Sequence, residues 1–358
     1  MSRIFDFATA EDAEGILEIM ESDIAGGAIK LLYTRRDNPL VSYHMESSES
    51  VVGVVKNGRR VCATIACIPS RIYLEGEIRR LSYVTGYKKR KDESAVINWY
   101  HAFDRMYGAT KCDLYYCSVV TDNKAVLEML HSPRKRMPYA VPIDTYHTYI
   151  INPAAKVGLS KSAENLSFKR ATKQDEKALI DFYRRCGKKR NFFPVIDSPD
   201  FMEGLDISDY YILYNGNEVV SAAALFDRTD CKQYIVKEYA GYMRFLRIFN
   251  PLLSLMGFVN LPKENTPFNF VYLSFFLAQN DDMDYYRIML HYIMKAAAKK
   301  YSMIIHGVNE HNPKKKLFDK VRHISFTTQL NEVNLSQISG KPIPAYDKRN
   351  IEVDCASL

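Results

Sequence analysis

One short pattern occurs twice in this chain, at a separation that matches the size of a domain. The pattern Phe-x-x-Ala-Thr-x-x-Asp begins at Phe5 and again at Phe168, 163 residues later. Solenoid repeats recur every 20 to 50 residues, approximately, whereas a whole domain commonly holds about 100 to 150. The pattern therefore predicts two copies of one domain rather than a repeat array.

Two further matches follow in the same order. An Asn-Gly dipeptide precedes an apolar run at Asn57 and again at Asn215, 158 residues later. Asn-Gly before an apolar run predicts a β-hairpin. A later match ends at Asn123 in the first copy and at Asn312 in the second, 189 residues apart. The second copy is therefore expected to hold about thirty extra residues after its hairpin.

These matches set the expected domain boundaries. We expect an N-terminal domain over residues 1–152, a linker over 153–164 and a C-terminal domain over 165–334. The insertion in the second domain is expected around residues 240–262. Residues 335–358, which contain two prolines near their start, are expected to form a tail packed on the surface.

The composition is that of a globular protein. The chain has 358 residues, of which 47% are hydrophobic, and a net charge of +7. Its start lacks the features of a signal peptide, so we expect a cytoplasmic protein. The basic clusters lie far apart without interleaved aromatic residues, which argues against nucleic-acid binding. The seven cysteines lack the spacing of metal ligands, so we expect reduced core thiols and no metal site.

The most apolar segment, Ala240–Val259, contains Arg244, Arg247 and Pro251, and these residues argue against a transmembrane helix. The segment is interpreted as a buried helical excursion, or as a lid or wall for an apolar acceptor or a membrane surface. If it is a lid, its large apolar side chains should line a pocket. These side chains are Phe245, Phe249, Leu252, Leu253, Met256 and Phe258.

Each copy shows the same predicted order of elements. A short strand leads into a capping box, in which Thr9 or Thr172 caps a helix and an aspartate follows three residues later. Antiparallel strands, a helix, a strand, a helix and a final strand follow. In the first copy, the second of these helices is expected over Ser94–Tyr107, after a strand over Leu81–Gly86.

This order, repeated, resembles a tandem form of the GNAT superfamily of acyl-CoA-dependent N-acyltransferases. The resemblance implies an α/β (α+β) protein of two GNAT-like domains, each a mixed, mostly antiparallel sheet flanked by helices. It implies an N-acyltransferase, such as an acetyltransferase, that moves an acyl group from acetyl-CoA or another acyl-CoA to an amine. The acceptor would be a small molecule or a peptide.

The family holds the pyrophosphate of CoA on a glycine-containing loop at a helix N-terminus. In the first copy, the corresponding stretch Val84–Ala95 lacks the glycines but carries four consecutive cations. The resemblance assigns cofactor binding to Val84, Lys88, Lys89, Arg90, Lys91, Ser94 and Ala95. Without a ligand, the same stretch reads as a basic loop before a helix capped by Asp92.

In the second copy, Gln279 matches the first position of the family loop, but Asp282 and Asp284 replace the glycines. Negative charge there would repel a pyrophosphate. We therefore expect CoA in the first copy only, with the second copy degenerate.

The family's catalytic groups are only partly present. Asn123 fills the position of its conserved asparagine, but Leu130 or Met129 replaces the tyrosine that protonates the leaving thiolate. Glu77 is the carboxylate nearest to the central strand and would act as base through a water. A backbone amide near Val84 would hold the oxyanion.

Two other functions remain open. The degraded loops are compatible with a catalytically silent scaffold or binding protein. The missing CoA loop is also compatible with a tRNA-dependent aminoacyl transferase resembling the Fem enzymes, which would bind RNA. Stabilisation by CoA or acetyl-CoA would separate these functions, because a ligand that binds only the folded state raises the melting temperature.

Overall fold

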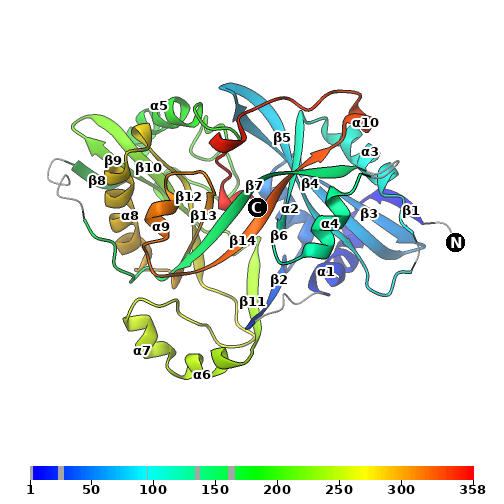
Figure 1. Ribbon diagram of the computed structural model, residues 1–358, viewed down its shortest axis with the longest axis horizontal. Coiled ribbons are helices and arrows are strands. Elements are labelled where there is room, and N and C mark those ends of the chain that lie inside the picture. Colours follow the sequence, from blue (N-terminus) through cyan, green and yellow to red (C-terminus); the bar gives the residue numbers. More distant parts are fainter. Residues whose placement is uncertain (1–2, 23–27, 95, 134–137, 160–165) are drawn as a thin grey trace.

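The chain forms one large sheet with helices packed against it, as the computed structural model shows (Figure 1). The structure describes residues 3–22, 28–94, 96–133, 138–159 and 166–358. From one edge to the other, the strands described in this sheet are β1 (Ile4–Phe7), β3 (Val51–Asn57), β4 (Arg60–Leu74), β5 (Glu77–Lys89), β6 (Leu114–Val120), β14 (His323–Asn334), β7 (Tyr139–Ile151), β13 (Met303–Asn309), β12 (Phe270–Ala278), β10 (Glu218–Phe226), β9 (Tyr210–Asn215) and β8 (Leu166–Arg170).

A separate two-stranded ribbon joins the copies, because β2 of the first pairs with β11 of the second. Its strands are β2 (Ile29–Thr34) and β11 (Gln233–Tyr239). The described helices are α1 (Ala13–Glu21), α2 (Pro39–Glu46), α3 (Trp99–Thr110), α4 (Lys124–His131), α5 (Glu176–Gly187), α6 (Tyr242–Ile248), α7 (Asn250–Leu255), α8 (Met283–Ala297), α9 (Lys315–Phe318) and α10 (Ser336–Ser339).

The repeated sequence patterns occupy equivalent places in the two copies. The capping boxes follow β1 and β8, and the backbone N–H groups of Thr9 and Thr172 donate to Asp12 and Asp175 at 2.9 and 3.0 Å. The Asn-Gly turns connect β3 to β4 and β9 to β10. The predicted duplication of the element order and the mixed, mostly antiparallel sheet are confirmed, with parallel pairing reported for β5–β6 and β12–β13.

The final strands of the two copies are exchanged at the centre of the sheet. β7 ends the first copy but pairs with β13 of the second, while β14 ends the second copy and pairs with β6 of the first. β7 and β14 also pair with each other antiparallel, from Tyr139↔Asn334 to Ile151↔His323. The two half-sheets are therefore one hydrogen-bonded surface.

The exchange brings two strands of different copies into close contact at Gly307. A Cβ atom on Gly307 of β13 would lie 1.9 Å from the hydroxyl oxygen of Tyr146 on β7 and 2.2 Å from its ring. Tyr146 is fully buried, and its hydroxyl donates to the carbonyl of Val353 at 3.0 Å. Only glycine therefore fits at this crossing.

The end of the chain does not lie on the surface as expected. Residues 351–356 are buried, and they pack against β12 and β13. The expectation followed from the prolines at Pro342 and Pro344, but the sequence after them alternates apolar and acidic residues that find partners inside the protein. No described helix is long and apolar enough to cross a bilayer.

We predict that Gly307→Ala destabilises the protein by about 1 to 3 kcal/mol or more. The added methyl group overlaps the ring of Tyr146, which has no exposed side to move towards. Urea unfolding of the purified variant measures the loss.

Gly108→Ala is the matched control. Gly108 lies in α3 with no atom within 4 Å of the added Cβ, so this substitution should be neutral or stabilise the helix by up to about 1 kcal/mol. Equal stability of the Gly307→Ala variant and the unmodified protein would contradict the close crossing of β7 and β13.

Candidate functional site

In the first copy, two neighbouring parallel strands separate part-way along their length. β5 and β6 pair only from Leu81↔Leu114 to Tyr83↔Tyr116. Beyond Tyr83, β5 continues beside β4, while β6 continues beside β14 as far as Val120. From Val84 onwards, the edge of β5 that faces away from β4 therefore has no strand beside it among the described residues, and a cavity of about 570 Å³ lies in this region.

The walls of this cavity are mainly apolar. They come from α1 and α2 at one end, from β5 and β6, and from α4, β7 and β14. Its apolar lining includes Met20, Tyr33, Tyr43, Val84, Phe103, Val119, Val126, Met129 and Leu130. Such a lining suits an apolar group rather than a strongly charged one.

Three residues assigned from the sequence meet at this cavity: Val84, Lys88 and Asn123. Lys88 donates from Nζ to the carbonyl of Met20 at 3.0 Å. Asn123 is the N-cap of α4, where its side-chain oxygen accepts from the N–H of Val126 at 3.4 Å. The structure thus brings one cation and one helix start to the cavity wall.

The other predicted cofactor residues do not line it. Lys89, Lys91 and Ser94 are exposed, and Ala95 lies outside the described residues. Arg90 donates from Nε to the carbonyl of Val61 at 2.7 Å and pairs with the carboxylate of Glu18.

The helix that follows begins later than predicted. α3 starts at Trp99, with Asn98 as its N-cap, and not at Ser94 behind Asp92. The side chain of Asn98 accepts from the N–H of His101 at 3.2 Å, whereas Asp92 pairs with Arg60. Asp92 and Arg90 pair with residues distant in the sequence, and the basic run lies at the end of β5 instead of flanking a helix N-terminus.

The second copy has the same strand separation, but the chain itself fills the space. β12 and β13 pair only from Phe270↔Met303 to Tyr272↔Ile305. Beyond this point, the Asp354 carboxylate accepts from the N–H of Phe275 at 2.7 Å. The N–H of Val353 donates to the side chain of Asn309 at 3.1 Å.

A buried ion pair holds the segment that fills the groove, residues 351–356, in place. Lys314 is fully buried and pairs with Glu352, and it also donates to the carbonyl of Phe276 at 2.7 Å. Glu352 also accepts from the side chain of Asn312, the counterpart of Asn123 in the second copy. The side chain of Asn312 is thus held by a structural hydrogen bond.

In the second copy, carboxylates of the chain itself lie at the N-terminus of α8. Asp282 is the N-cap of α8 and accepts from the N–H groups of Asp284 and Tyr285 at 2.8 and 3.1 Å. Asp281 beside it pairs with Arg190. These carboxylates occupy the place where a helix N-terminus would otherwise attract a phosphate.

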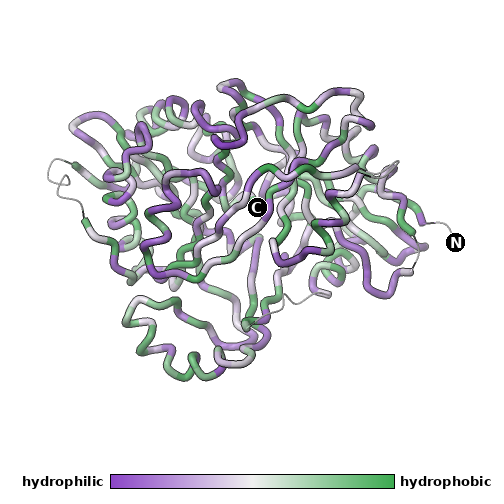
Figure 2. Tube along the Cα trace, in the orientation of Figure 1, coloured by the Kyte–Doolittle hydropathy of each residue, from purple (hydrophilic) through white to green (hydrophobic). Residues whose placement is uncertain are grey.

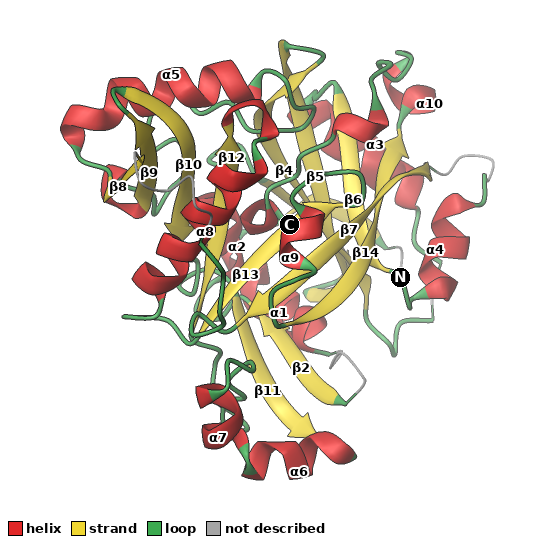
Figure 3. Cartoon of the chain, turned by 60° about the vertical axis from the view of Figure 1, so that its left-hand side comes forward, coloured by secondary structure: helices red, strands yellow, loops and turns green. Residues whose placement is uncertain are grey.

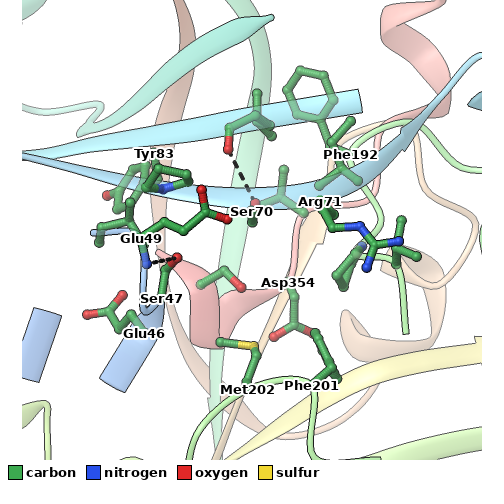
Figure 4. Close-up of a pocket in the computed structure, with 18 of the residues that line it drawn as sticks. Glu46, Ser47, Glu49, Ser70, Arg71, Tyr83, Phe192, Phe201, Met202 and Asp354 are labelled. Carbon is green, nitrogen blue, oxygen red and sulfur yellow. Dashed lines mark hydrogen bonds between the residues drawn. The ribbon is translucent and has the colours of Figure 1, made fainter. Parts of the chain in front are cut away.

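A second pocket, of about 200 Å³, lies at the junction of the two copies. Figure 4 shows Ser70 and Tyr83 of the first copy facing Met202 and Asp354 across it. Tyr83 also lines the larger cavity, and its hydroxyl forms a 2.7 Å hydrogen bond with the Ser118 hydroxyl. Tyr83 therefore lies in the wall of both spaces, at the point where β5 and β6 part.

Two buried carboxylates line this junction pocket. Burial would raise the pKa of Glu46, but Arg35 and Lys232 beside it bring the pKa below its usual value. Burial raises the pKa of Asp354 to about 6, against hydrogen bonds from the N–H groups of Phe275 and Ala356. Asp354 is thus a buried carboxyl group of this pocket whose pKa is raised towards neutrality.

Comparison with known proteins identifies solved structures of similar fold. No protein-family model matches the sequence, and no curated protein matches it significantly. The structure of Saccharomyces cerevisiae N-myristoyltransferase with bound myristoyl-CoA matches 98% of this chain and 89% of that chain, with a TM-score of 0.55 and 10% identity. The chain has a tandem GNAT fold.

A conserved protein of unknown function from Enterococcus faecalis V583, described as a probable N-acyltransferase, shares this fold. It matches 93% of this chain and 72% of that chain, with a TM-score of 0.50 and 7% identity. The resemblance inferred from the order of elements is therefore confirmed at the level of the fold.

Within the GNAT fold, Glu77 lies away from both pockets. It is the first residue of β5, is exposed, and pairs with Arg79. Gly86, at the cavity, is nine residues further along, about 30 Å in an extended strand. The structure does not bring Glu77 together with Asn123 or Val84.

Sequence reasoning did not single out Tyr83, Ser118 or Asp354. Tyr83 precedes Val84 in the strand predicted over Leu81–Gly86, so it could have been found as a neighbour of the expected oxyanion site. Asp354 carried no such signal, because it is 271 residues away from Tyr83 in the chain.

The apolar side chains of the insertion do not line either pocket. Phe245 is 68% exposed, Phe249 and Leu252 are each 60% exposed, and Met256 is 54% exposed. The expectation of a lid or a buried excursion is wrong for these side chains, because α6 and α7 project away from the body of the protein (Figure 3). No group of three or more potential metal ligands occurs among the described residues.

We predict that Glu352→Gln lowers the stability of the protein by about 3 to 5 kcal/mol, because Lys314 then keeps a buried charge without a partner. Adding Lys314→Met to Glu352→Gln should recover much of this loss, since no uncompensated charge remains. Urea unfolding at pH 7 measures both variants.

Asp181→Asn is the control, because Asp181 pairs with Lys177 and Arg184 on the exposed face of α5. Its loss should cost less than about 0.5 kcal/mol. A Glu352→Gln variant as stable as this control would show that the filling segment does not depend on the ion pair.

Proposed function

We propose that the protein is an acyl-CoA-dependent N-acyltransferase that works through its first copy. The acyl donor would lie in the cavity between β5 and β6, and the amine acceptor would enter through the junction pocket. The observation that carries this proposal is that Tyr83 lines both spaces. In this scheme, a thioester and an amine placed in them meet at Tyr83, next to Val84 in β5.

The cavity suits the donor in two ways. Its apolar walls fit the acyl chain and the pantetheine arm. Lys88 at its wall, with Lys89 and Lys91 beyond it, supplies positive charge for the phosphates. The residues of the second copy do not fit the same donor, because the segment around Asp354 fills its groove and Asp282 caps α8.

The chemistry is a direct displacement. The neutral amine attacks the thioester carbonyl, the C–N bond forms and the C–S bond breaks, and the thiolate leaves. We assign the oxyanion to a backbone amide near Val84, on the edge of β5 that no strand covers.

The proton of the amine passes through water to a carboxylate of the junction pocket. We assign this role to Asp354, whose pKa of about 6 leaves it ionised at neutral pH and able to accept a proton. Glu77 takes no part in this scheme, because it lies at the far end of β5. Asn123 remains a proposed site residue at the cavity wall.

We predict that CoA and acyl-CoAs raise the melting temperature of the protein by several degrees at saturating concentration. Val126→Trp, which places a large side chain at the wall of the cavity, should abolish the shift. Val41→Trp is the matched control, since Val41 is 55% exposed on α2 and outside the cavity. Differential scanning fluorimetry measures all three proteins.

Transfer is tested by release of free thiol from acyl-CoA in the presence of primary amines, with each product identified by mass spectrometry. Binding of CoA with no amine product would favour the silent binding protein. Absence of any CoA shift, with stabilisation by an aminoacyl-tRNA, would favour the Fem-like reaction. A CoA shift unchanged in Val126→Trp would place the donor outside this cavity.

A further inference from the structure

More than half of the large apolar side chains that the described chain exposes lie in one short segment. This segment, residues 242–258, contains nine of them, and Leu255, Ile248 and Phe245 are 84%, 70% and 68% exposed. Large apolar side chains that are exposed together on one short segment mark a candidate binding site for a protein or a membrane. Such a cluster is not explained by the proposed acyl transfer, since it lines neither pocket.

The segment forms a projecting tip. α6 and α7 follow the end of the β2–β11 ribbon and extend beyond the main sheet (Figures 1 and 3). Figure 2 shows the apolar colour of this part of the trace. Tyr33 on the same ribbon lines the proposed donor cavity, so the ribbon connects the tip to the wall of the site.

Polar bonds and a few buried side chains hold the tip in place. Asn152 donates from its side chain to the carbonyls of Phe258 and Ser254 at 2.6 and 3.1 Å. Met243 and Leu261 pack in a small core with residues of β11. The exposed apolar side chains therefore do not supply the packing that shapes the tip.

The charges of the tip have one sign. Residues 242–258 contain Arg244 and Arg247 and no carboxylate, and Lys263 and Glu264 follow this segment in the chain. Arg322 lies beside them, with its guanidinium 4.6 Å from the ring of Phe258. The neighbouring Glu238 of β11 pairs with Lys30 and Arg244. An apolar face with cations at its edge matches a surface of anionic head groups above acyl chains.

We propose that α6 and α7 dock the protein onto an anionic lipid bilayer. Phe249, Leu252 and Leu255 enter the head-group region, while Arg244 and Arg247 contact lipid phosphates and carboxylates. Aromatic and aliphatic side chains at such a boundary bind without spanning the membrane. A projecting tip reaches a flat bilayer without hindrance from the rest of the protein (Figure 3).

The test is co-sedimentation of the full chain with vesicles of phosphatidylcholine, with and without phosphatidylserine. We expect binding to the anionic vesicles, weaker binding at high salt, and little binding to phosphatidylcholine alone. The double variant Phe249→Ser with Leu255→Ser should lose about tenfold or more in affinity. Ile78→Ser is the matched control, because Ile78 is 51% exposed on β5, and it should bind like the unmodified protein.

Arg244→Gln with Arg247→Gln should weaken binding several-fold and reduce its dependence on salt. As a second measurement, Phe249→Trp should show a blue shift of its fluorescence on addition of anionic vesicles. Failure of the unmodified protein to sediment with either vesicle would overturn the proposal. So would a double serine variant that binds as well as the Ile78→Ser control. Self-association of the chain that depends on Phe249 and Leu255, without vesicle binding, would assign the tip to a protein contact instead.

Discussion

The pairing of β7 with β14 is the interaction on which the rest of the structure depends. Each strand ends one copy but lies beside the other, so the two half-sheets share their central hydrogen bonds. The close crossing of Tyr146 and Gly307 belongs to this pairing. Because the exchange joins the copies along a full pair of strands, the pocket at their junction has fixed walls rather than the adjustable walls of two linked domains.

The two copies differ in what occupies the space where parallel strands separate. In the first copy, the space between β5 and β6 is a cavity with mainly apolar walls. In the second, residues 351–356 fill it, and the pair between Lys314 and Glu352 compensates buried charges there. A buried ion is costly without its partner, so this filling is a stable part of the fold and not a removable plug.

The filling segment of the second copy also serves the first. Asp354 bonds to the backbone of β12 on one side and lines the junction pocket opposite Tyr83 on the other. The segment that fills the groove of the second copy thus also forms part of the wall of the junction pocket. This arrangement gives a physical reason for keeping a second copy whose own groove is filled.

The sequence by itself determined the features that depend on residues close together in the chain. The capping boxes at Thr9 and Thr172 and the turns after Asn57 and Asn215 use hydrogen bonds and backbone angles within a few residues, so their repetition predicted the duplicated fold. Val84, Lys88 and Asn123 were assigned through the family resemblance; Val84 and Lys88 lie in β5 and Asn123 follows β6, the two strands that separate at the cavity. The start of α3 was predicted too early because Asp92 is also a favourable N-cap residue, whereas in the structure Asn98 is the N-cap.

Only the tertiary structure decided which strands exchange, what fills the second groove and where the insertion points. These features depend on partners more than a hundred residues apart, such as Val353 with Tyr146, and no local pattern records them. The same holds for the apolar residues of α6 and α7. A run of apolar side chains has the same sequence whether it is buried in a core or exposed at a tip, and only the packing of the whole chain distinguishes the two.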